Sequence, residues 1–122
     1  MKYLFILIGG AMGALCRALI SETIEKVQFL FFPVGTIAVN IIGCFILGIL
    51  LSIMGTKYEE VYKPLILIGF LGSFTTFSAF SKETFQLMEQ GNWLIVAGYV
   101  GFTVFGCLLA TWLGIHITKA IH

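Results

Sequence analysis

The chain has 122 residues, of which 59% are hydrophobic and 11% are charged, and its formal net charge at neutral pH is +1. A soluble domain of this length cannot bury so much apolar surface, so the composition predicts an all-α membrane protein with a single transmembrane domain over residues 1–122. The small net charge argues against a nucleic-acid partner, which would need a strongly basic face.

Four hydrophobic segments are long enough to cross the core of a lipid bilayer as helices. An amphipathic stretch at 21–30 follows the first segment, and a polar connection at 55–63 precedes the third. Pro64 suits the first turn of the third helix, because its missing N–H needs no partner there. The predicted spans are residues 3–20, 34–54, 64–88 and 93–117. Four crossings place both termini on the same side of the membrane.

Positive charges are almost evenly divided between the two predicted sides. The terminal side carries Lys2, Lys57, Lys63 and Lys119, and the opposite side carries Arg17, Lys26 and Lys82. The positive-inside rule therefore gives only a weak orientation bias, and either orientation or both are open. A dual-topology chain can assemble as an antiparallel homodimer. Four helices alone also enclose little room for a conducting path, which favours a homo-oligomer.

The third span is interrupted by glycines and paired threonines, in the run GFLGSFTTFSAF from Gly69 to Phe80. Lipid offers no hydrogen bonds to a broken backbone, so a break at membrane depth must be buried in protein or line a polar cavity. We predict that the helix breaks at the membrane midplane, near residues 72–76. Unwound carbonyls at Gly72 and Thr75 would favour a cation.

Polar residues inside spans are costly and are therefore functional candidates. Arg17 either extends to lipid headgroups or forms an electropositive vestibule that attracts anions. Asn40 offers two donors and one acceptor, and we favour a ligand-facing donor over an interhelical hydrogen bond. Tyr99 and Thr103 lie four residues apart on one helix face. Their hydroxyls either extend a polar track or bond between helices.

Phe77 and Phe80 lie three residues apart after the predicted break and share a face. Packing against lipid explains most phenylalanines in such a chain, but these two have polar neighbours at Thr76, Ser78 and Ser81. Aromatic rings have positive edges, which can contact a dehydrated anion without the full charge that would trap it. Together with the donors at Asn40, Thr76 and Ser78, the two rings predict an anion path.

Other reactive residues show no catalytic pattern. Glu83 is the one acidic candidate within a span, and nothing resembles a carboxylate pair or a nucleophile with its base. We therefore predict no enzymatic activity. The cysteines Cys16, Cys44 and Cys107 lie in apolar stretches without Cys-x-x-Cys spacing and are interpreted as free packing residues.

The chain resembles the Fluc/CrcB family of fluoride channels in three glycine-spaced motifs that occur in order along the first three spans. The motifs are Gly9-Gly10-x-x-Gly13-Ala14-x-x-Arg17, Gly35-Thr36-x-x-Val39-Asn40-x-x-Gly43-x-Phe45-x-x-Gly48 and Gly69-Phe70-x-Gly72-x-x-Thr75-Thr76-Phe77-Ser78-x-Phe80-Ser81. The third motif is the most specific. Three positions, Ala18, Ala79 and Cys107, depart from the pattern that the family often shows.

The resemblance implies an antiparallel dual-topology homodimer in the inner (plasma) membrane with two narrow fluoride pores. It implies passive export of cytoplasmic fluoride, which lowers fluoride toxicity. It also implies a structural sodium ion at the dimer interface, held by the backbone carbonyls of Gly72 and Thr75. The fluoride path would be lined by Asn40, Phe77 and Phe80, helped by Thr76, Ser78, Tyr99 and Thr103, with Arg17 toward the vestibule.

The main alternative is a small four-helix, dual-topology multidrug antiporter. Such a carrier needs an acid within the membrane to exchange protons for cationic drugs, and Glu83 is a weak candidate for that role. A small membrane enzyme and a purely structural subunit are further alternatives. The first lacks a catalytic constellation, and the second would not need Asn40 or the Thr75-Thr76 break.

Overall fold

The computed structural model of the protein describes residues 1–26, 33–54 and 59–122, and all the regular elements in these ranges are helices. The elements are α1 (Lys2–Glu25), α2 (Val34–Ile53), α3 (Glu59–Tyr62), the π-helical segment η2 (Lys63–Leu71), α4 (Gly72–Phe74), α5 (Phe77–Glu89) and α6 (Trp93–Ile121). α3, η2, α4 and α5 together form the third potential span. The described ranges therefore contain four helical stretches long and apolar enough to cross a membrane, which confirms the predicted all-α class.

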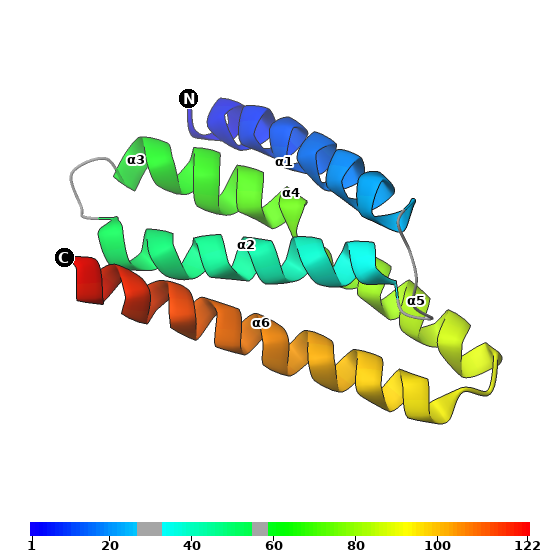
Figure 1. Cartoon of the computed structure of the whole chain (residues 1–122). Helices are drawn as coiled ribbons and strands as arrows, with labels where there is room; N and C mark the ends of the chain where they lie inside the picture. The colour runs from blue at the N-terminus through cyan, green and yellow to red at the C-terminus, as the bar shows by residue number, and fades with distance from the viewer. Residues whose placement is uncertain (27–32, 55–58) are drawn as a thin grey trace.

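The termini lie at the same end of the bundle, as four crossings require (Figure 1). α1 continues to Glu25, past the predicted end at Ile20, and its Thr23 hydroxyl donates to the Leu19 carbonyl. Residues 27–30 of the amphipathic stretch predicted at 21–30 lie outside the described residues. α6 likewise continues to Ile121, beyond the predicted end near Ile117.

The third span begins at Glu59, before the predicted start at Pro64. An ion pair between Glu59 and Lys63, with Oε1 and Nζ 3.1 Å apart, joins residues one helical turn apart and supports this earlier start. Pro64 has no N–H to donate to the preceding turn, and the backbone of η2 around it has the wider π-helical pattern. The remainder of the predicted polar connection, residues 55–58, lies outside the described residues.

Glycines set the closest helix contacts. α1 packs mainly against η2, where a Cβ atom at Gly9 would meet the Leu65 carbonyl and one at Gly13 would meet the Phe70 carbonyl. α2 packs mainly against α6, where Gly48 lies against Gly114. Small residues thus let the backbones approach closely, as expected for helices in lipid.

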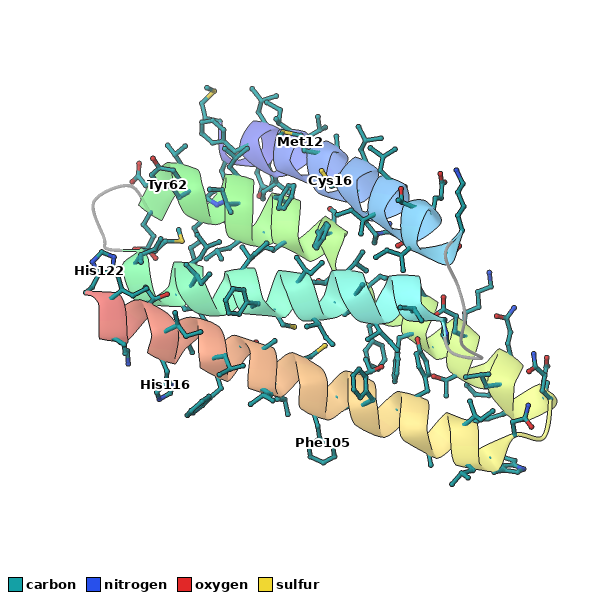
Figure 2. The ribbon with its side chains drawn as sticks, viewed as in Figure 1. Met12, Cys16, Tyr62, Phe105, His116 and His122 are labelled. Atoms are coloured by element: carbon teal, nitrogen blue, oxygen red, sulfur yellow. The ribbon has the colours of Figure 1, made fainter. Side chains whose placement is uncertain are left out.

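Large apolar side chains cover the outside of the bundle. Met12 and Phe105 point away from the helices, with 55% and 75% of their surfaces exposed (Figure 2). The buried cluster lies instead where α2, α5 and α6 meet. Its members are Ile37, Phe80, Leu87, Val96 and Tyr99. An apolar exterior around a small core suits a protein whose solvent is lipid.

Candidate functional site

The third span changes conformation at Thr75 and Thr76. Thr75 has φ −80° and ψ 152°, and Thr76 has φ −146° and ψ 116°, so both are extended between α4 and α5. The Thr76 hydroxyl then caps α5 by accepting a hydrogen bond from the Ala79 N–H at 3.2 Å. Threonine suits this N-cap position because its side chain replaces a missing backbone partner. α2 passes close to this segment at Gly43, where a Cβ atom would meet the Thr75 methyl group.

Two carbonyls, one at the start of α4 and one in the extended segment, lose the donor that a continuous α-helix would provide. The Thr76 N–H, which would donate to the Gly72 carbonyl, donates to Asn40 Oδ1 at 2.7 Å. The Ala79 N–H, which would donate to the Thr75 carbonyl, donates to the Thr76 hydroxyl. The Gly72 and Thr75 carbonyls are therefore released from the helical pattern, and these are the two groups predicted from the sequence to favour a cation.

Side chains from α1 and α2 hold the extended segment on two sides. Asn40 Nδ2 donates to the Thr76 carbonyl at 3.0 Å, so the Asn40 amide pairs with both backbone groups of Thr76. Arg17 Nε donates to the Ser73 carbonyl at 2.9 Å. Asn40 thus forms the interhelical hydrogen bonds that were the less favoured sequence interpretation. Arg17 is half-buried and contacts α4 just before the extended segment, which the sequence alone did not indicate.

Polar residues follow facing stripes on α2 and α6. On α2 they lie four residues apart at Thr36, Asn40 and Cys44, and on α6 at Tyr99, Thr103, Cys107 and Thr111. Such spacing places each set on one helix face. Thr36 and Cys44 were not singled out as site residues from the sequence, although their spacing from Asn40 was available as a signal.

Glu83 joins three helices through hydroxyl groups. Its Oε1 accepts a hydrogen bond from Thr36 Oγ1 at 2.8 Å, and its Oε2 accepts one from the Tyr99 hydroxyl at 2.7 Å. The fully buried Tyr99 is therefore committed to Glu83. Interhelical bonding, one of the two interpretations for the Tyr99 hydroxyl, is the arrangement found.

Thr103 differs from the other threonines of the site. Its side chain is 6% exposed, and within the described part of the chain its hydroxyl oxygen has no hydrogen-bond partner. Thr111, two turns away on α6, donates instead toward the carbonyls of Cys44 and Cys107. A buried hydroxyl without a partner is unfavourable unless another group or ligand meets it.

The two phenylalanines lie together but in different surroundings. Their ring centroids are 5.3 Å apart, and Phe80 also packs against Tyr99 at 5.2 Å. Phe80 is 7% exposed, whereas Phe77 is 77% exposed on the single chain. The shared face predicted from their spacing therefore lies at the edge of the core, with Phe80 inside it and Phe77 outside.

A cavity of about 340 Å³ lies beside the extended residues Thr75 and Thr76 and brings most of the predicted path residues together. Asn40, Thr76, Phe77, Phe80 and Thr103 line it. The other lining residues are Cys44, Thr75, Val104, Cys107 and Leu108. Ser78, two residues after Thr76, is exposed and does not line the cavity. The hydroxyl oxygens of the two residues are 3.2 Å apart. Arg17 and Tyr99 lie outside the lining, where Arg17 donates to the Ser73 carbonyl and Tyr99 donates to Glu83.

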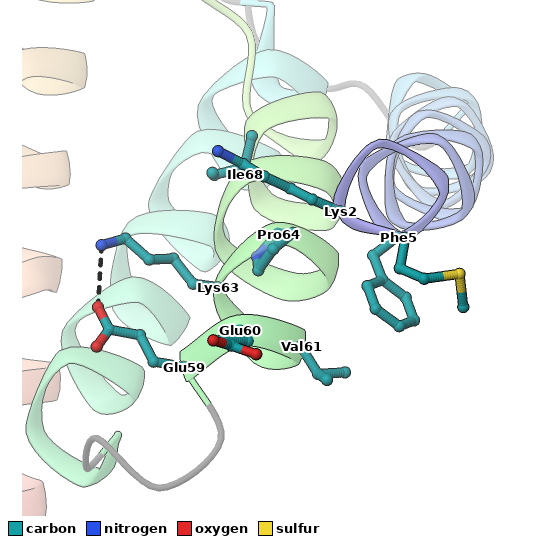
Figure 3. Close-up of a pocket in the computed structure, with 9 residues that line it drawn as sticks. Lys2, Phe5, Glu59, Glu60, Val61, Lys63, Pro64 and Ile68 are labelled. Atoms are coloured by element: carbon teal, nitrogen blue, oxygen red, sulfur yellow. Dashed lines mark hydrogen bonds and ion pairs between the residues drawn. The ribbon is translucent and has the colours of Figure 1, made fainter.

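A second, larger cavity of about 670 Å³ lies at the end of the bundle that carries the termini. It is bounded by the start of α1 and by α3 and η2, with Lys2, Phe5 and Ile68 around it (Figure 3). The exposed ion pair of Glu59 and Lys63 lies at its edge. Its lining differs from the predicted site residues, so the smaller cavity beside Thr75 and Thr76 is the candidate functional site.

Known proteins of a single family match this chain along nearly its whole length. Residues 4–115 match the family described as CrcB-like protein, Camphor Resistance (CrcB). A protein of Citrifermentans bemidjiense named Fluoride-specific ion channel FluC is 42% identical over 122 residues, which cover 98% of each chain. Proteins of the same name from Geotalea daltonii and Magnetococcus marinus are 44% and 38% identical, over 97% and 99% of this chain and 97% and 100% of their own. The chain belongs to the CrcB family.

Proposed function

We propose that the protein is a fluoride-selective channel that lets fluoride leave the cell passively across the inner membrane. Fluoride enters as neutral acid through lipid, ionises inside and is trapped, so an open anion path lowers its toxicity. The family membership and the name of the similar proteins support this function. The structural observation that carries it is the buried Thr103 hydroxyl, which lacks a partner among the described residues and lies in the cavity beside the break.

The path replaces the water around fluoride with uncharged donors. Asn40 Nδ2 has two N–H groups, of which one donates to the Thr76 carbonyl and the other is left for an anion in the cavity. The Thr103 hydroxyl is a second donor, and the edges of the Phe77 and Phe80 rings add weaker positive contacts. Thr76 and Ser78 extend these donors outward, whereas the Tyr99 hydroxyl donates to Glu83 and its ring supports Phe80. Neutral groups bind the ion without holding it too tightly to leave.

The Gly72 and Thr75 carbonyls would hold a structural sodium ion at the midplane of the membrane. Both lose their helical donor in the extended segment, and neutral carbonyl oxygens suit a hard cation. Such an ion would neutralise carbonyl dipoles that lipid cannot satisfy. Each chain supplies two of these oxygens, so a second chain is needed to complete the site.

The second chain would be an antiparallel copy of this one. Phe77 and Gly72 are both exposed near the extended segment. The fluoride path at Phe77 and the sodium site at Gly72 would both have to be shielded from lipid. The near balance of positive charge between the two ends allows both orientations in one membrane. An antiparallel copy would cover the two exposed residues, complete the sodium site and create two equivalent paths. Arg17 would add positive charge toward the vestibule.

The antiporter alternative gains no support from the similar proteins, which are named ion channels. Glu83, its required acid, accepts hydrogen bonds from two hydroxyls and lies outside the lining of the cavity.

Anion efflux from liposomes tests the function directly. Purified protein is reconstituted in vesicles loaded with equal fluoride and chloride, and a potassium ionophore starts the efflux. Ion-selective electrodes then record both anions. We expect rapid fluoride release with chloride retained. Equal release of the two anions, or retention of both by protein that is monodisperse in detergent, would contradict the proposal.

A further inference from the structure

Two cysteines face each other across the α2–α6 contact, inside the candidate site. The side chains of Cys44 and Cys107 are neighbours, and both line the cavity beside the extended segment at Thr75 and Thr76. The Thr111 hydroxyl oxygen lies 3.1 Å from the Cys44 carbonyl and 3.2 Å from the Cys107 carbonyl, which fixes the two backbones side by side. The cysteines are free, as predicted, and Cys44 and Cys107 border the cavity as well as packing between the helices.

The surrounding helices hold this thiol pair in place. One turn beyond Cys44, a Cβ atom at Gly48 would meet the Thr111 carbonyl and would lie 3.1 Å from the Gly114 Cα atom. Because the backbones touch at this point, the two helices that carry the thiols cannot move apart without breaking a close contact. A ligand that needs both sulfurs would therefore meet a preorganised pair, and little ordering would oppose its binding.

We propose that Cys44 and Cys107 bind a soft divalent cation such as mercury(II), and that the bound cation closes the fluoride path. Each thiol would lose its proton as its sulfur bonds to the metal, so two protons would leave for each cation and no electron would be transferred. Soft sulfur ligands select soft cations. Within the described residues there is no group of three or more His, Cys, Asp or Glu side chains that could hold a metal, so the two sulfurs would be the protein's ligands to the cation.

Charge favours a divalent cation over a monovalent one. Two thiolates and one divalent cation form a neutral unit, which avoids the high cost of an isolated charge in an apolar site. The described residues that line the cavity are all uncharged, so nearby side chains would neither repel the cation nor compete for it.

The position of the thiols explains why binding would close the path, and this step rests on the proposed function. Cys44 is one turn from Asn40, and Cys107 is one turn from Thr103, so the sulfurs border the two proposed fluoride donors. A cation between them would occupy space that the anion must cross. Fluoride is a hard base and would not displace sulfur from a soft cation.

Mercury(II) titration of the reconstituted, full-length protein tests the inference in chloride-free buffer, since chloride competes for the metal. The background is Cys16→Ser, which removes the cysteine on α1. Native mass spectrometry of the purified protein should show one mercury replacing two protons per chain. Cys44→Ser or Cys107→Ser should bind mercury on the order of 100-fold more weakly, because the second ligand is lost. At a mercury concentration that saturates only the Cys16→Ser protein, fluoride efflux should stop in that protein, whereas each double variant should keep the rate that it had before mercury was added.

These readouts separate failure of the site from failure of the function. Mercury binding by mass requires no fluoride flux, and flux before mercury is added tests the channel alone. If the untreated protein conducts fluoride but mercury binds equally with either cysteine removed, the site is wrong. If mercury binds through both sulfurs and efflux continues, the claim that this pair borders the path is overturned.

Discussion

The α1–η2 contact and the α2–α6 contact are both close, but they are built differently. Between α1 and η2, Gly9 and Gly13 bring the backbones together, and this contact lies away from the cavity. Between α2 and α6, Gly48 and Gly114 do the same toward one end, but nearer the break the contact is lined by Asn40 and other polar groups. In lipid, small residues thus allow helices to pack closely, whereas polar groups without partners in their own helix indicate where the functional site lies.

Gly13→Ala is expected to have the largest effect, because it damages the contact that is purely structural. The added methyl group would meet the Phe70 carbonyl, a backbone atom that cannot move aside easily. We expect a loss of about 3 kcal/mol in stability, which is enough to remove much of the folded protein. The stability loss is measured by heating the protein in detergent and determining by size-exclusion chromatography how much folded protein remains. Gly101→Ala is the control, since nothing in the described chain lies within 4 Å of a Cβ atom there.

Phe80→Ile should damage function and spare the fold. Isoleucine keeps an apolar side chain against Tyr99 but removes the ring edge from the cavity. We expect fluoride efflux to fall about 100-fold, which corresponds to about 3 kcal/mol less stabilisation of the dehydrated ion. Phe105→Ile, at an outward-facing ring, should leave efflux unchanged. Unchanged efflux in the Phe80 variant would remove the ring from the proposed path.

Asn40→Ala tests a residue that serves both the fold and the proposed path. The change leaves the N–H and the carbonyl of Thr76 without their side-chain partner. We expect a stability loss of about 2 kcal/mol together with reduced efflux. Asn92→Ala, at an exposed turn, is the matched control. Full stability in the Asn40 variant would mean that water or lipid headgroups replace the amide.

The sequence was sufficient for the helices but not for the partners of the site residues. Length and apolar character predicted four spans, and paired threonines after a glycine marked the segment where Thr75 and Thr76 are extended. The partners of Glu83 come from two other helices, so no local pattern could identify them. The contact of Arg17 with the Ser73 carbonyl likewise depends on which carbonyls the extended segment releases.

Thr103→Val should raise stability and lower efflux, whereas Asn40→Ala should lower both. Valine has the shape of threonine, and it removes a hydroxyl that lacks a partner in the described structure. Stability should therefore rise by about 1 kcal/mol, while fluoride efflux falls about 10-fold because one donor is lost. Thr111→Val should instead lower stability, because its hydroxyl contacts two carbonyls. A Thr103 variant with unchanged efflux would show that this hydroxyl does not meet the ion.

Glu83→Gln is expected to have the smallest effect, and it distinguishes a channel from a proton-coupled carrier. Glutamine keeps the length of the side chain, and its oxygen can still accept a hydrogen bond from Thr36 or Tyr99. The other hydroxyl can rotate to accept a bond from the new amide. The contact between the three helices is therefore retained, and efflux should change by less than about 2-fold, or under 0.5 kcal/mol. Glu83→Leu, which removes both acceptors, should lower stability instead.

A carrier that exchanges protons depends on the acid itself and would lose all transport in the Glu83→Gln variant. The decisive measurement is fluoride efflux with and without an imposed pH gradient, at equal protein content. Passive conduction predicts that the ratio of the two rates is the same in the variant and the parent protein. Loss of transport in a well-folded Glu83→Gln protein would place the essential chemistry at the Thr36–Glu83–Tyr99 cluster and not at the extended segment. A third region, where Glu83 joins α2, α5 and α6, would then perform the function in place of the polar part of the α2–α6 contact.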